Sequence, residues 1–346
     1  MTIRENVPLA PYTTFHIGGP ARFFAEVESE EDLAKAVSFA HTENLPIFIL
    51  GAGSNLLISD EGYSGLVIHM KNEHVELKEH EGGVLVVADA GMNWDTLVAM
   101  CVERGLWGLE NLSGIPGSVG ASVVQNIGAY GKEVGSCVEW VDVYEKDSRT
   151  KRRISKEDCK LAYRDSIFKH NEGGQYIVVR VGYLLSAVGV PDINYKDITE
   201  YATNEKPINS LHDVREAVLI IRSQKFPSSP EHPHIGTAGS FFKNPVVSAD
   251  VARAFIKHFP GAPAYPQQEG SMKLSAAWII DHILQMKGVR EGEVGTWSAQ
   301  SLVMINYGCA SASDVATFAE QIMVRARKET GVRLEPEVVY VGDIKT

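Results

Sequence analysis

Residues 114–131, "GIPGSVGASVVQNIGAYG", decide the fold of this chain. Five glycines punctuate the stretch, so the backbone must either take positive φ repeatedly or approach another group closely. The stretch is too irregular for an ordinary strand or a long helix, and a loop of this length in a compact domain is usually functional. It predicts a ligand-binding loop, with a structural knot of turns as the alternative.

A second glycine-rich stretch, "LGAGSN" at residues 50–55, directly follows an apolar strand. Gly51 and Gly53 allow backbone N–H groups to turn towards an anion and bind phosphate without a cationic side chain. The third glycine and the following helix of a dinucleotide Rossmann fingerprint are missing. Alone, the stretch fits a plain strand-to-strand turn better than a ligand-binding loop. Together, the two stretches predict an extended ligand the size of a dinucleotide.

Length, charge and composition limit the function. With 346 residues, the chain should fold as two or three domains. A net charge of −11 argues against a nucleic-acid or anionic-membrane partner. The four cysteines lack Cys-x-x-Cys spacing and no His-Glu-x-x-His motif occurs, so we expect no metal site. Because no signal peptide or membrane span is recognisable, we expect a cytoplasmic monomer that acts on small molecules.

Hydrophobic periodicity predicts an α+β protein. Two strand-like runs flank a Gly82-Gly83 turn, which indicates a hairpin. Proline and serine cluster at residues 226–236, where a domain boundary is expected. We expect a last strand at 332–342 and helices at 29–41, 93–105, 210–226, 248–259, 273–288 and 311–331.

Two motifs, one around Ser240 and one around Arg164, each have several interpretations. Ser240 lies in "GSFFKNP" and is a candidate nucleophile, proton donor, ligand contact or simple turn residue. A serine hydrolase would need a Gly-x-Ser-x-Gly elbow, which this stretch lacks. Arg164, in "YRDSIFK", is suited to gripping a carboxylate or phosphate at two points, although a surface ion pair is the alternative.

Further charged residues come in pairs. Arg222 and Lys225 are three residues apart on a predicted helix and share a face. Glu335 and Glu337, in "LEPE", point the same way from a predicted strand. Two close carboxylates raise the pKa of one of them and make a hydrogen-bond donor. Solvated side chains are the alternative in both cases.

Six motifs in one order resemble a known family. The chain resembles the UDP-N-acetylenolpyruvoylglucosamine reductases (the MurB family) of peptidoglycan precursor synthesis. The resemblance extends from about residue 12 to 342. The motifs are "TTFHIGG", "LGAGSNLL", "IPGSVGASVVQNIGAYG", "YRDSIFK", "GSFFKNP" and "LEPEV".

The resemblance implies an α+β architecture. An FAD-binding region of the vanillyl-alcohol-oxidase (PCMH) type in two subdomains would be joined to a smaller α+β substrate-binding domain. The expected boundaries are 1–70 for the first FAD-binding subdomain and 71–226 for the second, completed by 331–346. The substrate-binding domain would then cover 227–330.

The resemblance also implies non-covalent FAD and NADPH as co-substrate. The expected FAD contacts are Gly51, Ala52, Gly53, Ser54, Asn55, Leu56, Ile115, Gly117, Ser118, Ser122, Asn126, Ile127, Gly128, Ala129 and Arg222. Ser240, Glu337 and Arg164 match the catalytic positions of the family. Tyr195, Lys225, Asn244, Gln300 and, again, Arg164 match its substrate-binding positions.

The implied reaction reduces an enolpyruvyl group on a UDP-sugar to give UDP-N-acetylmuramate. Hydride addition leaves negative charge beside a carboxylate, which Arg164 and a protonated Glu337 would stabilise while Ser240 supplies the proton. Tyr195 lies in an insertion typical of the longer branch of the family. Val339 stands where many relatives carry arginine, so a flavin contact by that side chain is in doubt. An FAD-dependent alcohol or sugar oxidase of the same fold is the alternative; a non-enzymatic flavin-binding module is less well supported.

Overall fold

The computed structural model describes residues 1–170, 173–227, 232–267 and 270–345. The chain divides into two compact units. The first comprises Met1–Val7, Ala21–Ala52 and Ser64–Ser223, and the second comprises Pro8–Pro20, Gly53–Tyr63 and Gln224–Thr346. The three-part division expected from the sequence stays a prediction, and residues 228–231 of the expected boundary lie outside the described residues.

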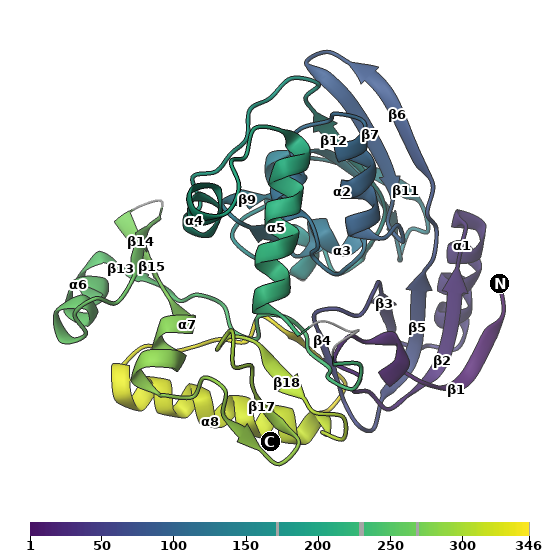
Figure 1. Ribbon diagram of the computed structural model, residues 1–346. Coiled ribbons are helices and arrows are strands. Elements are labelled where there is room, and N and C mark those ends of the chain that lie inside the picture. The colour runs from purple at the N-terminus through teal and green to yellow at the C-terminus, as the bar shows by residue number, and fades with distance from the viewer. Residues whose placement is uncertain (171–172, 228–231, 268–269, 346) are drawn as a thin grey trace. The chain divides into compact units, whose positions relative to one another are not determined.

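The first unit opens with a four-stranded sheet in the order β1-β2-β5-β3 (Figure 1). β3 and β5 pair in parallel, which requires the chain to cross over between them. Helix α1 begins after Ser29, whose side chain accepts a hydrogen bond from the Asp32 N–H. The bounds are β1 Ile3–Pro8, β2 Pro20–Val27, α1 Glu30–Thr42, β3 Ile47–Leu50 and β5 Tyr63–Met70.

The first unit also contains a five-stranded antiparallel sheet, in the order β11-β10-β12-β7-β6. The hairpin expected at Gly82-Gly83 is confirmed, since His80 pairs with Gly83. The bounds are β6 Val75–His80, β7 Gly83–Asp89, β10 Val138–Glu145, β11 Lys151–Ser155 and β12 Tyr176–Leu185.

Helices cover this second sheet. α3 packs on β12 and β7, and buried Trp94, Leu97 and Val98 of α2 join the same hydrophobic core. A smaller cluster packs α4 against α5 through Ile198 and Val218. The bounds are α2 Trp94–Glu103, α3 Val119–Val124, α4 Lys196–Asn204 and α5 Leu211–Lys225, with short elements η2 Glu110–Leu112, β8 Gly128–Ala129, β9 Lys132–Glu133, η3 Val134–Ser136 and η4 Ile167–Lys169.

The second unit has its own core around Phe241, Phe242 and the buried face of α8. Two small sheets, in the orders β13-β15-β14 and β16-β17-β18, accompany the parallel pair β19-β4. The bounds are η1 Ala10–Tyr12, β4 Leu56–Ile58, β13 Val246–Ser248, α6 Ala249–His258, β14 Ala264–Pro266, β15 Ser271–Leu274, α7 Ala276–Trp278, η6 Ile279–Ile283, β16 Arg290–Glu291, β17 Val294–Thr296, β18 Met304–Asn306, α8 Ala312–Thr330 and β19 Val339–Val341.

Most expected helices and strands are confirmed, with two corrections in the second unit. The helix expected at 273–288 is a single turn, α7, followed by the π-helical turn η6. It begins later than expected because Lys273 and Leu274 belong to strand β15. The last strand is also shorter than expected. Only Val339–Val341 form β19, while Pro336 makes an isolated bridge with Phe242.

Gly53 and Gly292 make a matched pair for testing the glycine-rich turn. Both have positive φ, +63° and +62°. A Cβ on Gly53 would lie 2.0 Å from the Tyr12 carbonyl oxygen, whereas one on Gly292 would meet open space. We expect Gly292→Ala to cost only the left-handed penalty of about 1–2 kcal/mol in the free energy of unfolding. Gly53→Ala should cost clearly more in thermal or denaturant unfolding; equal losses would contradict this account of the turn.

Candidate active site

The predicted site residues fall into two groups, one in each unit. In the first unit, the two glycine-rich loops meet. A Cβ on Gly51 would lie 2.4 Å from the Ser118 Oγ and 3.4 Å from the Ser118 Cβ, so the two loops approach each other closely here. Ser118 in turn caps α3, accepting from the Ala121 N–H. The loops that sequence reasoning assigned to one extended ligand are therefore neighbours in the fold.

The remaining FAD-contact candidates of this unit are differently exposed. Ala52 is exposed, while Ile115, Ile127 and Ala129 pack against the core. Ser122 and Asn126 are buried, and their side chains are bonded within the protein: the Ser122 hydroxyl donates to the Val119 carbonyl and shares a hydrogen bond with the Tyr183 hydroxyl. Their predicted contacts with FAD stay predictions.

Arg164 sits at the tip of a tight turn. Ala162 and Asp165 exchange two backbone hydrogen bonds, each 3.0 Å long. Arg164 has φ +53°, in the left-handed region that residues other than glycine rarely adopt. Its Nη2 donates to the Gly128 carbonyl oxygen at 2.7 Å. The guanidinium is thus tied to the second glycine-rich loop.

Arg222, near the end of α5, is held by the same loop. Its Nε donates to the Gly114 carbonyl oxygen at 3.0 Å, and the guanidinium hydrogen-bonds with the Tyr130 hydroxyl. Burial lowers the pKa of Arg222 and raises the pKa of Tyr130 to about 12. Tyr195 contacts the Tyr130 ring edge-on, with the ring centroids 5.5 Å apart.

An ion pair that the sequence did not indicate supports Gly114. Asp95, in the first turn of α2, accepts hydrogen bonds from Nη1 and Nη2 of Arg215 at 2.6 and 2.8 Å and from the Gly114 N–H at 2.6 Å. Such a two-point pair is geometrically specific. Gly114 then links Asp95 to Arg222, because its N–H and its carbonyl are bonded to the two side chains respectively.

In the second unit, Ser240 lies in an extended segment that pairs with the segment around Leu302 and with the segment around Glu337. On one side the Phe241 N–H donates to the Leu302 carbonyl, and on the other the Glu337 N–H donates to the Phe241 carbonyl. Gln300 starts the turn that leads into this pairing, with its carbonyl accepting from Val303. The pairing brings together candidates from residues 240, 300 and 337.

Glu337 is also tied to the first glycine-rich stretch. Asn55 Nδ2 donates to the Glu337 carbonyl at 3.1 Å, and the Val339 N–H donates to the Asn55 carbonyl at 3.0 Å. Leu56 then pairs with Val339 at the start of β4 and β19. Glu337 is half-buried and Glu335 exposed, alternating with buried Leu334 and Val338.

Other predicted residues of the second unit have mixed surroundings. Asn244 Oδ1 accepts from the Ala276 N–H at 2.9 Å and so caps α7. Lys225 is the last residue of α5, and Ser54 is half-buried in the loop before β4. The substrate contacts assigned to Lys225 and Asn244 stay predictions.

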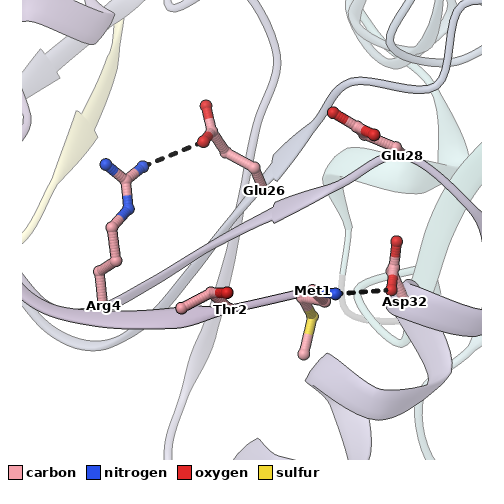
Figure 2. A pocket seen from close by; sticks show the side chains of 6 residues that line it. All are labelled: Met1, Thr2, Arg4, Glu26, Glu28 and Asp32. Carbon is pink, nitrogen blue, oxygen red and sulfur yellow. Dashed lines mark hydrogen bonds and ion pairs between the residues drawn. The ribbon is translucent and has the colours of Figure 1, made fainter.

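A cavity of about 390 Å³ lies elsewhere in the first unit. Figure 2 shows that it is lined by Met1, Thr2, Arg4, Glu26, Glu28 and Asp32. It contains none of the predicted site residues, and its three acidic residues are accompanied by Arg4 and the N-terminal ammonium group of Met1. Among the described residues, no cluster of histidine, cysteine and carboxylate side chains could hold a metal ion, and no helix is long and apolar enough to span a bilayer.

Known proteins match the chain over almost its whole length. Two family models match, described as "FAD binding domain" for residues 21–152 and as "UDP-N-acetylenolpyruvoylglucosamine reductase, C-terminal domain" for residues 230–341. The chain is thus similar to an FAD-binding domain in its first half and to a reductase domain in its second.

Proteins named UDP-N-acetylenolpyruvoylglucosamine reductase are similar throughout. The one from Neisseria meningitidis serogroup A is 40% identical over 96% of this chain and 96% of its own. The one from Porphyromonas gingivalis is 36% identical over 99% and 100%, respectively. A solved MurB structure from Thermus caldophilus has 27% identity and a TM-score of 0.67, covering 99% of this chain and 100% of its own. The expected α+β architecture with an FAD-binding domain is confirmed.

Asp95→Asn tests the support of Gly114. Although burial opposes it, hydrogen bonds from Arg215 and the Gly114 N–H lower the pKa of Asp95 below 3.8. Because the folded-state pKa is lowered, this stabilisation is present above about pH 4 and lost as the pH falls through the folded-state value. We expect Asp95→Asn to cost about 2 kcal/mol of unfolding free energy at pH 7, and less as the pH falls below 4.

Asp250→Asn is the matched control. Asp250 is likewise the second residue of its helix and pairs with an arginine, but the two side chains are 87% and 72% exposed. Denaturant unfolding should show a change of no more than about 0.5 kcal/mol. If both substitutions cost the same, or if the Asp95 effect is independent of pH, the ion pair does not stabilise this loop.

Proposed function

Since the chain belongs to the family of UDP-N-acetylenolpyruvoylglucosamine reductases, we propose that it reduces the enolpyruvyl ether of UDP-N-acetylglucosamine to UDP-N-acetylmuramate. NADPH is the reductant and FAD the non-covalent cofactor. The reaction supplies a peptidoglycan precursor, and the oxidase alternative is not favoured by these similarities. The close approach of Gly51 to Ser118 is the structural observation that best supports the proposal.

The glycine-rich loops fit FAD. Backbone N–H groups in such loops accommodate a pyrophosphate without cationic side chains, which suits a chain with a net charge of −11. Bound FAD would supply the chemistry of hydride transfer from NADPH to the enolpyruvyl double bond. Gly51, Gly53, Ser118 and the rest of the predicted set would hold it.

Arg164 and Glu337 would stabilise the charge that hydride addition creates. That charge spreads from the carbon beside the carboxylate into the carboxylate itself, so a cation or neutral acid there lowers the barrier. The Arg164 guanidinium is anchored on one side by Gly128, which orients the group for a two-point contact. Glu337 would donate a hydrogen bond in its protonated form.

Ser240 would hold the proton that completes the reduction. A hydroxyl is a weak acid, but the carbanionic carbon is a strong base, so a well-placed hydroxyl can protonate it. Two-sided backbone pairing of residues 240–243 supports such placement. Lys225 would stabilise the resulting alkoxide.

Tyr195, Asn244 and Gln300 would bind the UDP-sugar. Tyr195 is 44% exposed, so part of its ring is accessible to a ligand. We further propose that the protein acts as a monomer in the cytoplasm, in keeping with its small-molecule substrates.

The colour of the bound flavin tests this function. Purified protein should be yellow and should bleach anaerobically with NADPH. Adding the enolpyruvyl UDP-sugar should restore the yellow absorption much faster than adding oxygen alone, because the substrate is the electron acceptor of a reductase. Colourless protein that FAD cannot reconstitute, or reoxidation by oxygen but not by the sugar, would contradict the proposal.

Ser240→Ala tests the proton donor. Reduction of the flavin by NADPH should stay near normal, whereas its reoxidation by the enolpyruvyl UDP-sugar should slow about 100-fold or more, since general acid catalysis contributes that much. Stopped-flow absorbance measures both half-reactions. Ser148→Ala, at an exposed turn, is the control and should leave both rates unchanged. Normal reoxidation in Ser240→Ala would exclude Ser240 as the donor.

A further inference from the structure

The segment containing Arg164 is fastened to the end of helix α3. Four side-chain hydrogen bonds connect the two. Asn126 Nδ2 donates to the Ala162 carbonyl at 2.7 Å, and Ser166 Oγ donates to the Val124 carbonyl at 2.7 Å. Arg164 Nη2 adds its bond to Gly128, and Lys169 provides the fourth link. The turn therefore has little freedom relative to residues 124–128.

Lys169 is hydrogen-bonded directly to the backbone of Arg164, the residue with the left-handed φ. Its Nζ donates to the Arg164 carbonyl oxygen at 2.9 Å and to the Gln125 Oε1 at 3.1 Å. One half-buried ammonium thus joins the backbone of Arg164 to Gln125, the residue that caps the C-terminus of α3. An ammonium has three N–H donors and no acceptor, so it can make both bonds at once.

The carbonyl bond acts on the backbone conformation of Arg164. A left-handed φ of +53° is unfavourable for arginine and persists only where surrounding contacts enforce it. Without the Lys169 contact, the carbonyl loses a charge-assisted partner and the peptide plane can rotate. Rotation of that plane changes ψ of Arg164 and so releases the left-handed backbone conformation from which the side chain projects.

We propose that Lys169 is a positioning residue that holds Arg164 in its left-handed conformation and so aims the guanidinium at the substrate carboxylate. This inference rests on the proposed role of Arg164. Small misplacements of an orienting group reduce rates strongly, by as much as 100-fold for about 1 Å. Asn126 is a poorer test position, because it also bonds Glu133 and the Gly135 N–H.

The test compares Lys169→Met with Lys156→Met in the FAD-loaded protein. Lys156 also donates to a backbone carbonyl, that of Ser136 at 3.0 Å, but in a different loop. Lys169→Met should slow reoxidation of the reduced flavin by the enolpyruvyl UDP-sugar about 10-fold or more. Flavin reduction by NADPH, the dissociation constant of FAD and the melting temperature should stay close to those of Lys156→Met. Reoxidation at the rate of Lys156→Met would overturn the proposal.

An Arg164→Met background separates positioning from a general effect. If Lys169 acts through Arg164, adding Lys169→Met to Arg164→Met should slow reoxidation by less than a factor of about 2. If Lys169→Met slows reoxidation as much in the Arg164→Met background as it does alone, the proposal is overturned. If Arg164→Met alone reoxidises normally, the role of Arg164 itself is wrong; if it is slow while Lys169→Met is normal, only the positioning role is wrong.

Gln125→Leu keeps the inference testable should Lys169→Met fail to fold or to bind FAD. This substitution removes only the Gln125 Oε1, which accepts the hydrogen bond from Lys169 at the end of α3. We expect reoxidation about 3-fold slower or more, again with normal reduction by NADPH. An unchanged reoxidation rate in a folded, FAD-loaded Gln125→Leu protein would overturn the proposal in that case.

Discussion

Backbone pairing on both sides of residues 240–243 is the interaction on which the proposed roles of Ser240 and Glu337 depend. Phe241 bonds Leu302 through its N–H and Glu337 through its carbonyl, and the Lys243 N–H bonds the Glu335 carbonyl. Phe241 and Phe242 are each 1% exposed, so the same segment is anchored in the core. A hydroxyl and a carboxyl far apart in the chain therefore start from adjacent, well-fixed backbone positions.

The first unit uses strained backbone in a comparable way. Asn126, Tyr130 and Arg164 all have positive φ and all belong to, or bond with, the second glycine-rich stretch. Such conformations persist where the surrounding contacts over-determine them and are frequent at functional sites. Here those contacts come from Asn126 and Lys169 around the Arg164 turn. Around Gly114 they come from Asp95 and Arg222.

Sequence patterns predicted most of the elements and the family resemblance implied the chemistry, but neither indicated the supporting contacts. Periodicity identified α1, α2, α5 and the Gly82 hairpin because each is encoded by neighbouring residues. The pair between Asp95 and Arg215 joins residues 120 apart, and no local pattern reports such a partner. The last strand was overestimated because alternation also occurs in extended segments that make only one bridge. Lys169 belongs to the same short motif as Arg164, yet its two hydrogen-bond acceptors are set by tertiary structure.

The proposed reaction passes a hydride and a proton to an enolpyruvyl double bond. The most direct measurement is the mass of the sugar after one anaerobic turnover of NADPH-reduced protein with the enolpyruvyl UDP-sugar. We expect one equivalent, per flavin, of a product heavier by two hydrogen atoms, formed as the flavin regains its yellow absorption. Recovery of the unchanged enolpyruvyl sugar, with the flavin still reduced, would contradict it.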